Sequence, residues 1–392
     1  MTKNKLKSDK SLNASKIKII GVGGAGISVV KRMLQKNISQ VDYIVVDTDE
    51  QALDSLDLDG VKKIQIEKNI TKGADASLHL DKDKENILKN KDDLKKIANK
   101  AGIIFIAVGL GGVTGSGIGP VVADICKKSN ALTVGVLTKP FNFEGRERLR
   151  IANKAILNFK DKLDAFVLMS NSRIMQIVDR QTSINKAFDV VDEAVRDGIS
   201  LFTNILNKTG IININLSDIA SILKGAGPIF LGSGKVDLQA PAKQAGTKAL
   251  ENPLIEDLVP QKAKNIIFVI SGPESLPMSK VDNLANRINK ELRTDARIIF
   301  GTIIEKNRQN IGVTLIGTEF KERFENGDEK SQNSFSNKRN QKSDFIRKRV
   351  RPQKQVKAYG EASPETKEEL MENGNFEDEL DIPAFLRKKL KK

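Results

Sequence analysis

The most informative segment of the sequence is Ala107-Val-Gly-Leu-Gly-Gly-Val-Thr-Gly-Ser-Gly117. The apolar run 103–108 leads into it and has the length and composition of a buried strand. Pro120 follows it and suits the first turn of a helix. Backbone N–H groups at a helix N-terminus, together with the helix dipole, favour a bound phosphate. Five glycines in the nine residues 109–117 exceed the needs of a tight turn, so the sequence predicts a phosphate-binding loop.

Composition narrows the class of protein. The chain has 392 residues, enough for two domains plus tails, and one cysteine. Cys126 alone can form neither an internal disulfide nor a cysteine zinc site, and we expect it to pack inside the helix after the loop. His79 lies in a polar stretch and is expected to be solvated. No apolar run approaches the roughly 20 residues of a membrane span, and the lysine-rich residues 1–15 do not resemble a secretory signal. A reducing cytoplasmic setting fits these features.

The formal charge of +15 does not by itself indicate a nucleic-acid partner. Residues 338–357 hold nine Lys or Arg against one acid, whereas residues 361–381 hold nine acids against one lysine. The net charges of the two blocks cancel, which indicates a tail with alternating basic and acidic segments and not a basic domain. Because aromatic residues for base stacking are few, we expect no nucleic-acid binding.

A second glycine-rich motif lies nearer the N-terminus. A predicted strand, 17–20, runs into Gly21-Val-Gly-Gly-Ala-Gly26, and a helical pattern follows. The next predicted strand, 42–46, ends at Asp47, about twenty residues beyond the first glycines. This is the spacing of a dinucleotide-binding unit, so a nicotinamide-dependent enzyme is one alternative. A lone GxGxxG motif is a weak signal.

The remaining segments predict an α/β protein with a second, smaller domain. Further strands are predicted at 130–137 and 164–169, and strands that alternate with helices favour a parallel sheet. Residues 183–207 lack proline and carry an apolar stripe at helical spacing, as a long connecting helix would. Four more predicted strands and a helix follow; the strands are 226–231, 265–271, 297–302 and 311–317.

Gly232-Ser-Gly-Lys235 is not expected to be a Walker loop. Position 229 is Ile in place of the upstream glycine, and Val236 replaces the Ser or Thr that would hold magnesium. From about 321 hydrophobicity collapses, which predicts disorder, until an apolar island at 380–387 that indicates a docking peptide. The predicted parts are therefore a disordered arm (1–15), a nucleotide-binding domain (16–182), a central helix (183–209), an α+β domain (210–320), a disordered linker (321–378) and a docking peptide (379–392).

Two glycine segments after strands of one sheet are more than a dehydrogenase needs. Together with Thr138–Gly145, Asn185–Asp192 and Leu380–Arg387, they resemble the FtsZ family of bacterial cell-division proteins, relatives of tubulin. The resemblance covers about 16–320 and the terminal peptide. It implies a tubulin-like, Rossmann-type parallel sheet that binds GTP, a long central helix and a smaller α+β domain.

The resemblance also implies roles for individual residues. Glu144 would contact the ribose and Arg148 the ribose–phosphate side, and Asn171 would contact the sugar or the base. Phe188 would stack on the guanine, and Asp192 would accept hydrogen bonds from the N1–H and the exocyclic amine of that base. Without the resemblance, Phe188 would be interpreted as a core residue and Asp192 as part of a solvated helix face. The phosphates would be held by Gly23, Gly24, Gly111, Gly112, Val113, Thr114, Gly115, Ser116 and Gly117.

Hydrolysis of GTP to GDP, with Mg²⁺ expected alongside, is implied to occur at a junction between subunits. The loop 213–218 of one subunit, with Asp218 and Asn215, would reach the nucleotide of the next and orient a water. Such head-to-tail contacts build open filaments. The implied setting is the division ring at mid-cell in the cytoplasm. Division proteins and membrane tethers such as FtsA-type adaptors would bind the tail, so that membrane contact is indirect, through Asp381, Ile382, Pro383, Phe385, Leu386 and Arg387.

Several residues depart from the pattern of the family near the phosphates. Val113 replaces a glycine and is expected to restrict the backbone. Asp47 replaces an asparagine and adds negative charge, and the segment 71–77 is shortened. Asn215 stands where an aspartate is usual, which leaves Asp218 as the acid of its loop. We therefore expect slow hydrolysis; the alternative is a non-hydrolysing scaffold that acts through its C-terminal peptide.

Overall fold

The structure is a computed structural model. It describes residues 16–320 except 36–40, 55–59, 67–90, 180, 208–211, 213, 253, 256–257, 293–294 and 307. The predictions for the N-terminal arm, the 71–77 segment, His79, the linker and the docking peptide lie outside the described residues.

The first sheet is wholly parallel. Among the described residues it has seven strands, in the order β3-β2-β1-β4-β5-β6-β7. Its strands read as apolar runs because both faces are covered, and β6 is buried along its whole length. The five strands predicted before residue 170 are confirmed, whereas the lysine-rich β3 gave no clear signal. The strands are β1 (Lys16–Val22), β2 (Val41–Asp47), β3 (Val61–Gln65), β4 (Ala101–Gly109), β5 (Leu132–Lys139), β6 (Ala165–Ser170) and β7 (Gly227–Pro228).

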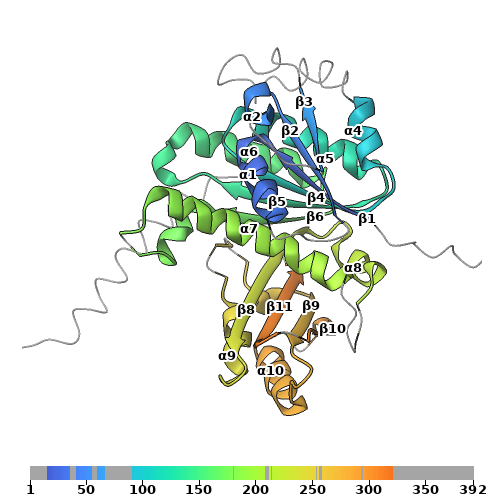
Figure 1. The fold of residues 1–392 in the computed structure, drawn as a ribbon, viewed down its shortest axis with the longest axis vertical. Coiled ribbons are helices and arrows are strands. Elements are labelled where there is room, and N and C mark those ends of the chain that lie inside the picture. The colour runs from blue at the N-terminus through green and yellow to red at the C-terminus, as the bar shows by residue number, and fades with distance from the viewer. Residues whose placement is uncertain are drawn as a thin grey trace, which may run out of the picture. The chain divides into compact units, whose positions relative to one another are not determined.

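Helices cover both faces of this sheet (Figure 1). One face packs against α4, α5 and α6, in a core that contains the buried Cys126, as predicted. The other face packs against α1 and the long α7, and the predicted central helix is confirmed. The helices before residue 208 are α1 (Gly23–Leu34), α2 (Glu50–Asp54), α4 (Lys91–Ala98), α5 (Gly119–Lys127), α6 (Arg146–Lys160) and α7 (Ile184–Asn207).

A second, mixed sheet follows, with the order β10-β9-β11-β8 in the described part of the chain. The predicted strand 226–231 is wrong in its bounds. Residues 227–228 pair with β6 of the first sheet, and β8 begins at Phe230, so the chain passes from one sheet to the other there. The elements are α8 (Leu216–Leu223), β8 (Phe230–Asp237), α9 (Lys243–Leu250), β9 (Asn265–Gly272), α10 (Met278–Glu291), β10 (Arg297–Ile304) and β11 (Asn310–Thr318).

The Gly-Ser-Gly-Lys segment at 232–235 lies within β8, so its rejection as a Walker loop is confirmed. Glycine is required there by close packing of the strand on α9. A Cβ at Gly232 would lie 1.7 Å from the carbonyl oxygen of Ala249, and one at Gly234 would lie 1.9 Å from that of Ala245.

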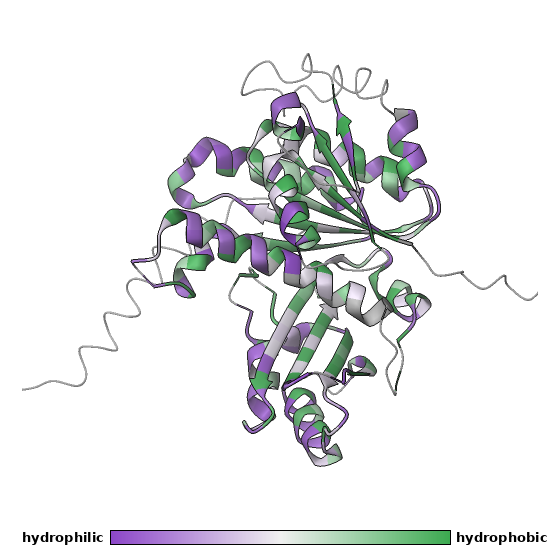
Figure 2. Cartoon of the chain, viewed as in Figure 1, coloured by the Kyte–Doolittle hydropathy of each residue, from purple (hydrophilic) through white to green (hydrophobic). Residues whose placement is uncertain are grey.

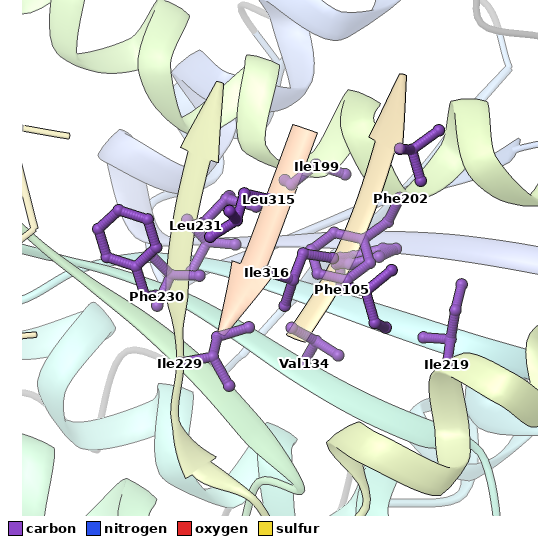
Figure 3. Packing of buried hydrophobic residues seen from close by; sticks show 14 of the residues in the cluster. Phe105, Val134, Ile199, Phe202, Ile219, Ile229, Phe230, Leu231, Leu315 and Ile316 are labelled. Carbon is purple, nitrogen blue, oxygen red and sulfur yellow. The ribbon is translucent and has the colours of Figure 1, made fainter. Parts of the chain in front are cut away.

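A shared core joins the two sheets around α7. Ile199 and Phe202 of this helix belong to one buried cluster with Phe105 of β4 and with Leu315 and Ile316 of β11 (Figure 3). The rings of Phe105 and Phe202 are 5.2 Å apart. Apolar residues concentrate on the strands and polar residues on the outer helices (Figure 2). None of the helices in the described residues combines the length and apolarity that crossing a membrane would need.

Candidate functional site

A cavity of about 320 Å³ opens where the carboxyl ends of several parallel strands meet. This edge is where open α/β sheets bind ligands, and the volume suits a small-molecule site. Residues within one position of the ends of β1, β4, β5 and β6 line it: Val22, Gly109, Thr138 and Asn171.

The turn after β1 presents backbone to this cavity. Gly23 has φ +73°, a conformation that favours glycine, and it begins α1. A Cβ at Gly24 would meet nothing within 4 Å. No described side chain caps the start of α1, so its first N–H groups are available to an anion.

The segment predicted as a glycine-rich loop is a loop only in its first half. Gly111, with φ +94°, makes the turn, and Thr114–Ile118 then form a π-helical turn that continues into α5. The backbone N–H of Gly111 donates to the fully buried Ser116 hydroxyl at 2.9 Å. Ser116 therefore shapes the turn from behind, whereas Gly112 and Thr114 face the cavity.

Val113 also lines the cavity, but its backbone is ordinary. Its φ of −64° and ψ of −51° are helical values that valine adopts without strain. Val113 is therefore not strained, and the expectation that its β-branched side chain restricts the backbone stays a prediction. Compared with a glycine, Val113 adds an isopropyl side chain to the cavity wall.

Two charged residues on the far wall bind each other. Arg148 donates through Nη1 to Glu144 Oε2 at 2.7 Å, one turn apart on the chain. The other oxygen of Glu144 accepts the backbone N–H of Phe141 at 2.8 Å. Both carboxylate oxygens are thus engaged, and this wall presents a paired, roughly neutral surface.

Asn171 and Phe188 complete the wall. Asn171 is buried, and its Oδ1 has no hydrogen-bond partner among the described residues. A buried acceptor without a donor is costly, so a ligand that donates here would be stabilised. Phe188 is 38% exposed and lies edge-on to Phe141, with ring centroids 5.0 Å apart.

Asp192 lies one turn beyond Phe188 on α7 but does not line the cavity. Its carboxylate accepts from Arg32 Nε of α1 at 3.2 Å, and Arg32 also pairs with Asp189. Burial raises the pKa of Asp192 above its usual value, and the Arg32 hydrogen bond partly offsets this shift. The pKa of Arg32 is raised because its bonds to the two carboxylates outweigh the opposing effect of burial.

Ten of the fourteen predicted nucleotide-site residues therefore meet at one cavity. Gly111, Ser116, Gly117 and Asp192 do not line it. Six other residues line the cavity and were not predicted as site residues. Two of them, Gly109 and Thr138, lie at or beside the carboxyl ends of predicted strands, which was a usable signal. The unassigned residues are Val22, Ala25, Gly109, Leu110, Thr138 and Pro140.

The predicted catalytic pair lies elsewhere in the chain. Asn215 and Asp218 start α8, beyond the C-terminal end of α7, and neither lines the cavity. From Phe188 to Asn207, α7 alone spans roughly 28 Å at the rise of an α-helix. The cavity and the pair therefore flank opposite ends of the central helix.

Asp47, which completes the dinucleotide-like spacing, is not placed to bind a ribose. It is buried at the end of β2, does not line the cavity, and accepts hydrogen bonds from Thr48 and Thr114. A nicotinamide enzyme would need this acid at the cofactor. The geometry therefore does not support the nicotinamide alternative.

Fold and site together define a nucleotide-binding protein of the tubulin type. Residues 16–179 match the model of the Tubulin/FtsZ family GTPase domain, and residues 227–321 match that of the FtsZ family C-terminal domain. Over 385 residues the chain is 29% identical to the cell division protein FtsZ of Buchnera aphidicola, which covers 97% of this chain and 98% of that one.

Solved structures agree. An empty FtsZ dimer from M. jannaschii is 30% identical, with a TM-score of 0.69, over 79% of this chain and 89% of that one. A GTPγS-bound CetZ2 protofilament from Haloferax volcanii, 19% identical, shares the fold with a TM-score of 0.66 over 85% of this chain and 99% of that one. The chain belongs to the FtsZ family, and it is a GTPase of the kind that binds guanine nucleotide.

Proposed function

We propose that this chain binds GTP, polymerises head-to-tail and hydrolyses GTP slowly at the subunit junction. The observation that carries the proposal is the separation of the nucleotide cavity from Asn215 and Asp218 by the length of α7. A chain with these two half-sites at opposite ends completes a catalytic centre only when the next subunit supplies the other half.

In the proposed complex, uncapped N–H groups at the starts of α1 and the Thr114–Ile118 turn hold the phosphates. Phe188 stacks on the guanine. Asp192 accepts hydrogen bonds from the guanine. For this, Arg32 or α7 shifts so that the carboxylate of Asp192 is shared between Arg32 and the base. Asn171 Oδ1 accepts from a ribose hydroxyl or from the base, which satisfies its unpartnered oxygen.

Hydrolysis relies on positioning a water in line with the γ-phosphate. Asp218 of the following subunit supplies the carboxylate that orients this water. Asn215 offers an amide, which accepts a hydrogen bond but does not take up a proton near neutral pH. One carboxylate in place of two is the reason for the proposed slow turnover.

Mg²⁺ fits the oxygen-rich corner of the site. Thr114 lines the cavity, and Asp47 and Thr48 lie within hydrogen-bond distance of its hydroxyl from outside the lining; such hard oxygen donors suit this cation and its bound waters. When bound with the nucleotide, Mg²⁺ would neutralise phosphate charge.

Exposed apolar side chains support a contact at each end of α7. Phe143, Met175, Ile177 and Ile184 surround the start of this helix, near the cavity, and all are more than 45% exposed. Ile212 and Ile298 are exposed beyond its other end, where residue 212 bridges to Thr302 of β10. Two separate apolar patches suit a head-to-tail polymer, and relatives have been solved as a dimer and a protofilament.

The proposed cellular role follows from the family. The polymer forms the division ring at the future septum, in the cytoplasm at mid-cell. The C-terminal segment 379–392 docks on division proteins and FtsA-type membrane tethers. The second candidate function, a non-hydrolysing scaffold that uses the same tail, is favoured by Asn215 at the catalytic loop.

The test is sedimentation and phosphate release measured in one tube, with GTP, GDP and no nucleotide. The proposal predicts that pellets form only with GTP and that phosphate appears slowly above a threshold protein concentration. Pellets without any phosphate would favour the scaffold. Phosphate release that is proportional to protein at all concentrations would contradict hydrolysis at a junction.

A further inference from the structure

Asp47 holds an unusual number of donors on one oxygen. Its Oδ1 accepts the backbone N–H of Thr48 at 2.7 Å and that of Asp49 at 3.3 Å. The hydroxyls of Thr114 and Thr48 lie at 3.4 and 3.5 Å from the same atom. Hydrogen bonds from such donors are stronger to an ionised carboxylate than to a neutral amide oxygen, so the arrangement suits a negative charge. Asp47 is 5% exposed, which keeps solvent from screening that charge.

This arrangement fixes what Thr114 can offer a ligand. Thr114 lines the cavity, and its hydroxyl carries a single proton. When that proton points to Asp47, or to Thr48 Oγ1 at 3.3 Å, the oxygen turns its lone pairs toward the cavity. Phosphate oxygens accept hydrogen bonds and do not donate them. Thr114 is therefore a poor partner for a bare phosphate and a good one for the waters around a cation.

The charges around the cavity act in the same direction. Among the described lining residues only Glu144 and Arg148 are charged, and they pair with each other at 2.7 Å. Asp47 lies one hydrogen-bond length behind Thr114, within roughly 6 Å of any atom that touches the Thr114 hydroxyl. Among these side chains Asp47 therefore adds one unpaired negative charge, which repels the charge of a bound triphosphate.

We propose that Asp47 makes this site select the Mg²⁺ complex of the nucleotide over the free nucleotide. The inference rests on the proposed binding of GTP. The carboxylate orients the Thr114 hydroxyl and adds the charge that the cation offsets. Asp47 acts as a specificity-determining residue through Thr114 and does not itself touch the phosphates.

The experiment is calorimetric titration of the full chain with GTP and GDP, in MgCl₂ and in EDTA, at protein concentrations where no pellet forms. The test variant is Asp47→Asn, which preserves shape and removes the charge. The matched control is Asp49→Asn, two residues along, where the side chain is exposed and its oxygen accepts only the N–H of Gln51 among the bonds described. Thermal unfolding verifies that each variant is folded.

We expect EDTA to weaken GTP binding to the unsubstituted chain and to Asp49→Asn by at least about tenfold, and binding to Asp47→Asn by less than about threefold. Equal sensitivity to EDTA in all three proteins would overturn the inference while leaving GTP binding intact. Absence of GTP binding in both buffers would overturn the proposed function, and the inference with it. In a Thr114→Val background, Asp47→Asn should reduce the weakening of GTP binding by EDTA less than it does in the unsubstituted chain. If Asp47→Asn has the same effect in both backgrounds, Thr114 is not the residue through which Asp47 acts.

Discussion

Asn215 and Asp218 cap one helix by exchanging two hydrogen bonds. The backbone N–H of Asn215 donates to Asp218 Oδ2 at 3.0 Å, and that of Asp218 donates to Asn215 Oδ1 at 2.9 Å. This reciprocal capping box fixes both side chains at the start of α8. The pair that the family resemblance assigns to catalysis is thus also a structural device, and substitutions there must be judged on stability and turnover separately.

Asn215→Asp should raise GTP turnover without loss of stability. Aspartate caps a helix about as well as asparagine, so the unfolding temperature should shift by less than about 2 °C. The added carboxylate supplies a second group to orient water, and turnover should rise several-fold in a phosphate-release assay. Asn215→Ser, which keeps a cap without the charge, is the control; an equal gain from both changes would contradict a role for the carboxylate.

Arg32→Ala should destabilise the protein in a pH-dependent way. The substitution leaves the half-buried Asp192 carboxylate without its guanidinium partner, at a cost of roughly 1–2 kcal/mol near pH 7.5. Burial already raises the pKa of Asp192, and loss of Arg32 raises it further. Because the folded variant binds a proton at higher pH than the unfolded chain does, the deficit should shrink as pH falls toward 4.5.

Chemical denaturation at the two pH values measures this effect. Asp189→Asn removes the more exposed of the two Arg32 partners and should leave the pH dependence largely unchanged. In an Asp192→Asn background, Arg32→Ala should cost the same free energy at both pH values. Parallel curves for Arg32→Ala and the unsubstituted chain would show that Asp192 is not the group responsible.

Phe188→Ala should weaken GTP binding about tenfold or more, since stacking on a base is worth about 1–3 kcal/mol. The side chain is partly exposed and lines the cavity, so the loss should fall on binding more than on folding. Phe143→Ala is the control, because Phe143 also stacks on Phe141, at 4.8 Å, yet lies outside the cavity. Equal losses in equilibrium titration of the two variants would refute the stacking role.

The sequence predicted the first sheet well because parallel strands buried on both faces are continuous apolar runs. It predicted the wrong bounds for 226–231, since local hydrophobicity does not tell which of two sheets a strand joins. It located the glycine segments but not the π-helical turn at 114–118, in which the Ser116 hydroxyl accepts a hydrogen bond from the backbone N–H of Gly111.

The site was only partly predictable for a related reason. Residues on the glycine segments and the motif 138–145 are local signals, and they meet at the cavity. The pairing of Asp192 with Arg32 joins positions 160 residues apart, and that of Asp47 with Thr114 joins positions 67 apart. Only the packing of α1 on α7, and of β2 beside the Thr114 turn, brings these groups together.

Gly232→Ala should destabilise the second sheet by roughly 2–3 kcal/mol. Its Cβ would collide with the carbonyl oxygen of Ala249, a backbone atom that cannot rotate away. Ser233→Ala, at the exposed position between the two glycines, should change the free energy of unfolding by less than about 0.5 kcal/mol. A tolerated Gly232→Ala would mean that β8 and α9 are not packed as closely as described.

The central claim is that one subunit completes the nucleotide site of the next, and complementation between two inactive variants tests it most directly. Asp218→Ala keeps the cavity and loses the catalytic acid. Gly112→Asp keeps the acid and blocks the cavity, because a side chain at Gly112 enters open space and its charge repels phosphate. Neither variant alone should release phosphate from GTP.

Phosphate release from an equimolar mixture of the two variants is therefore the decisive measurement. We expect the mixture to regain turnover, because Asp218 of the cavity-blocked subunit reaches the GTP held by its neighbour. A mixture that co-sediments with GTP yet releases no more phosphate than its separate components would rule out a site shared between subunits.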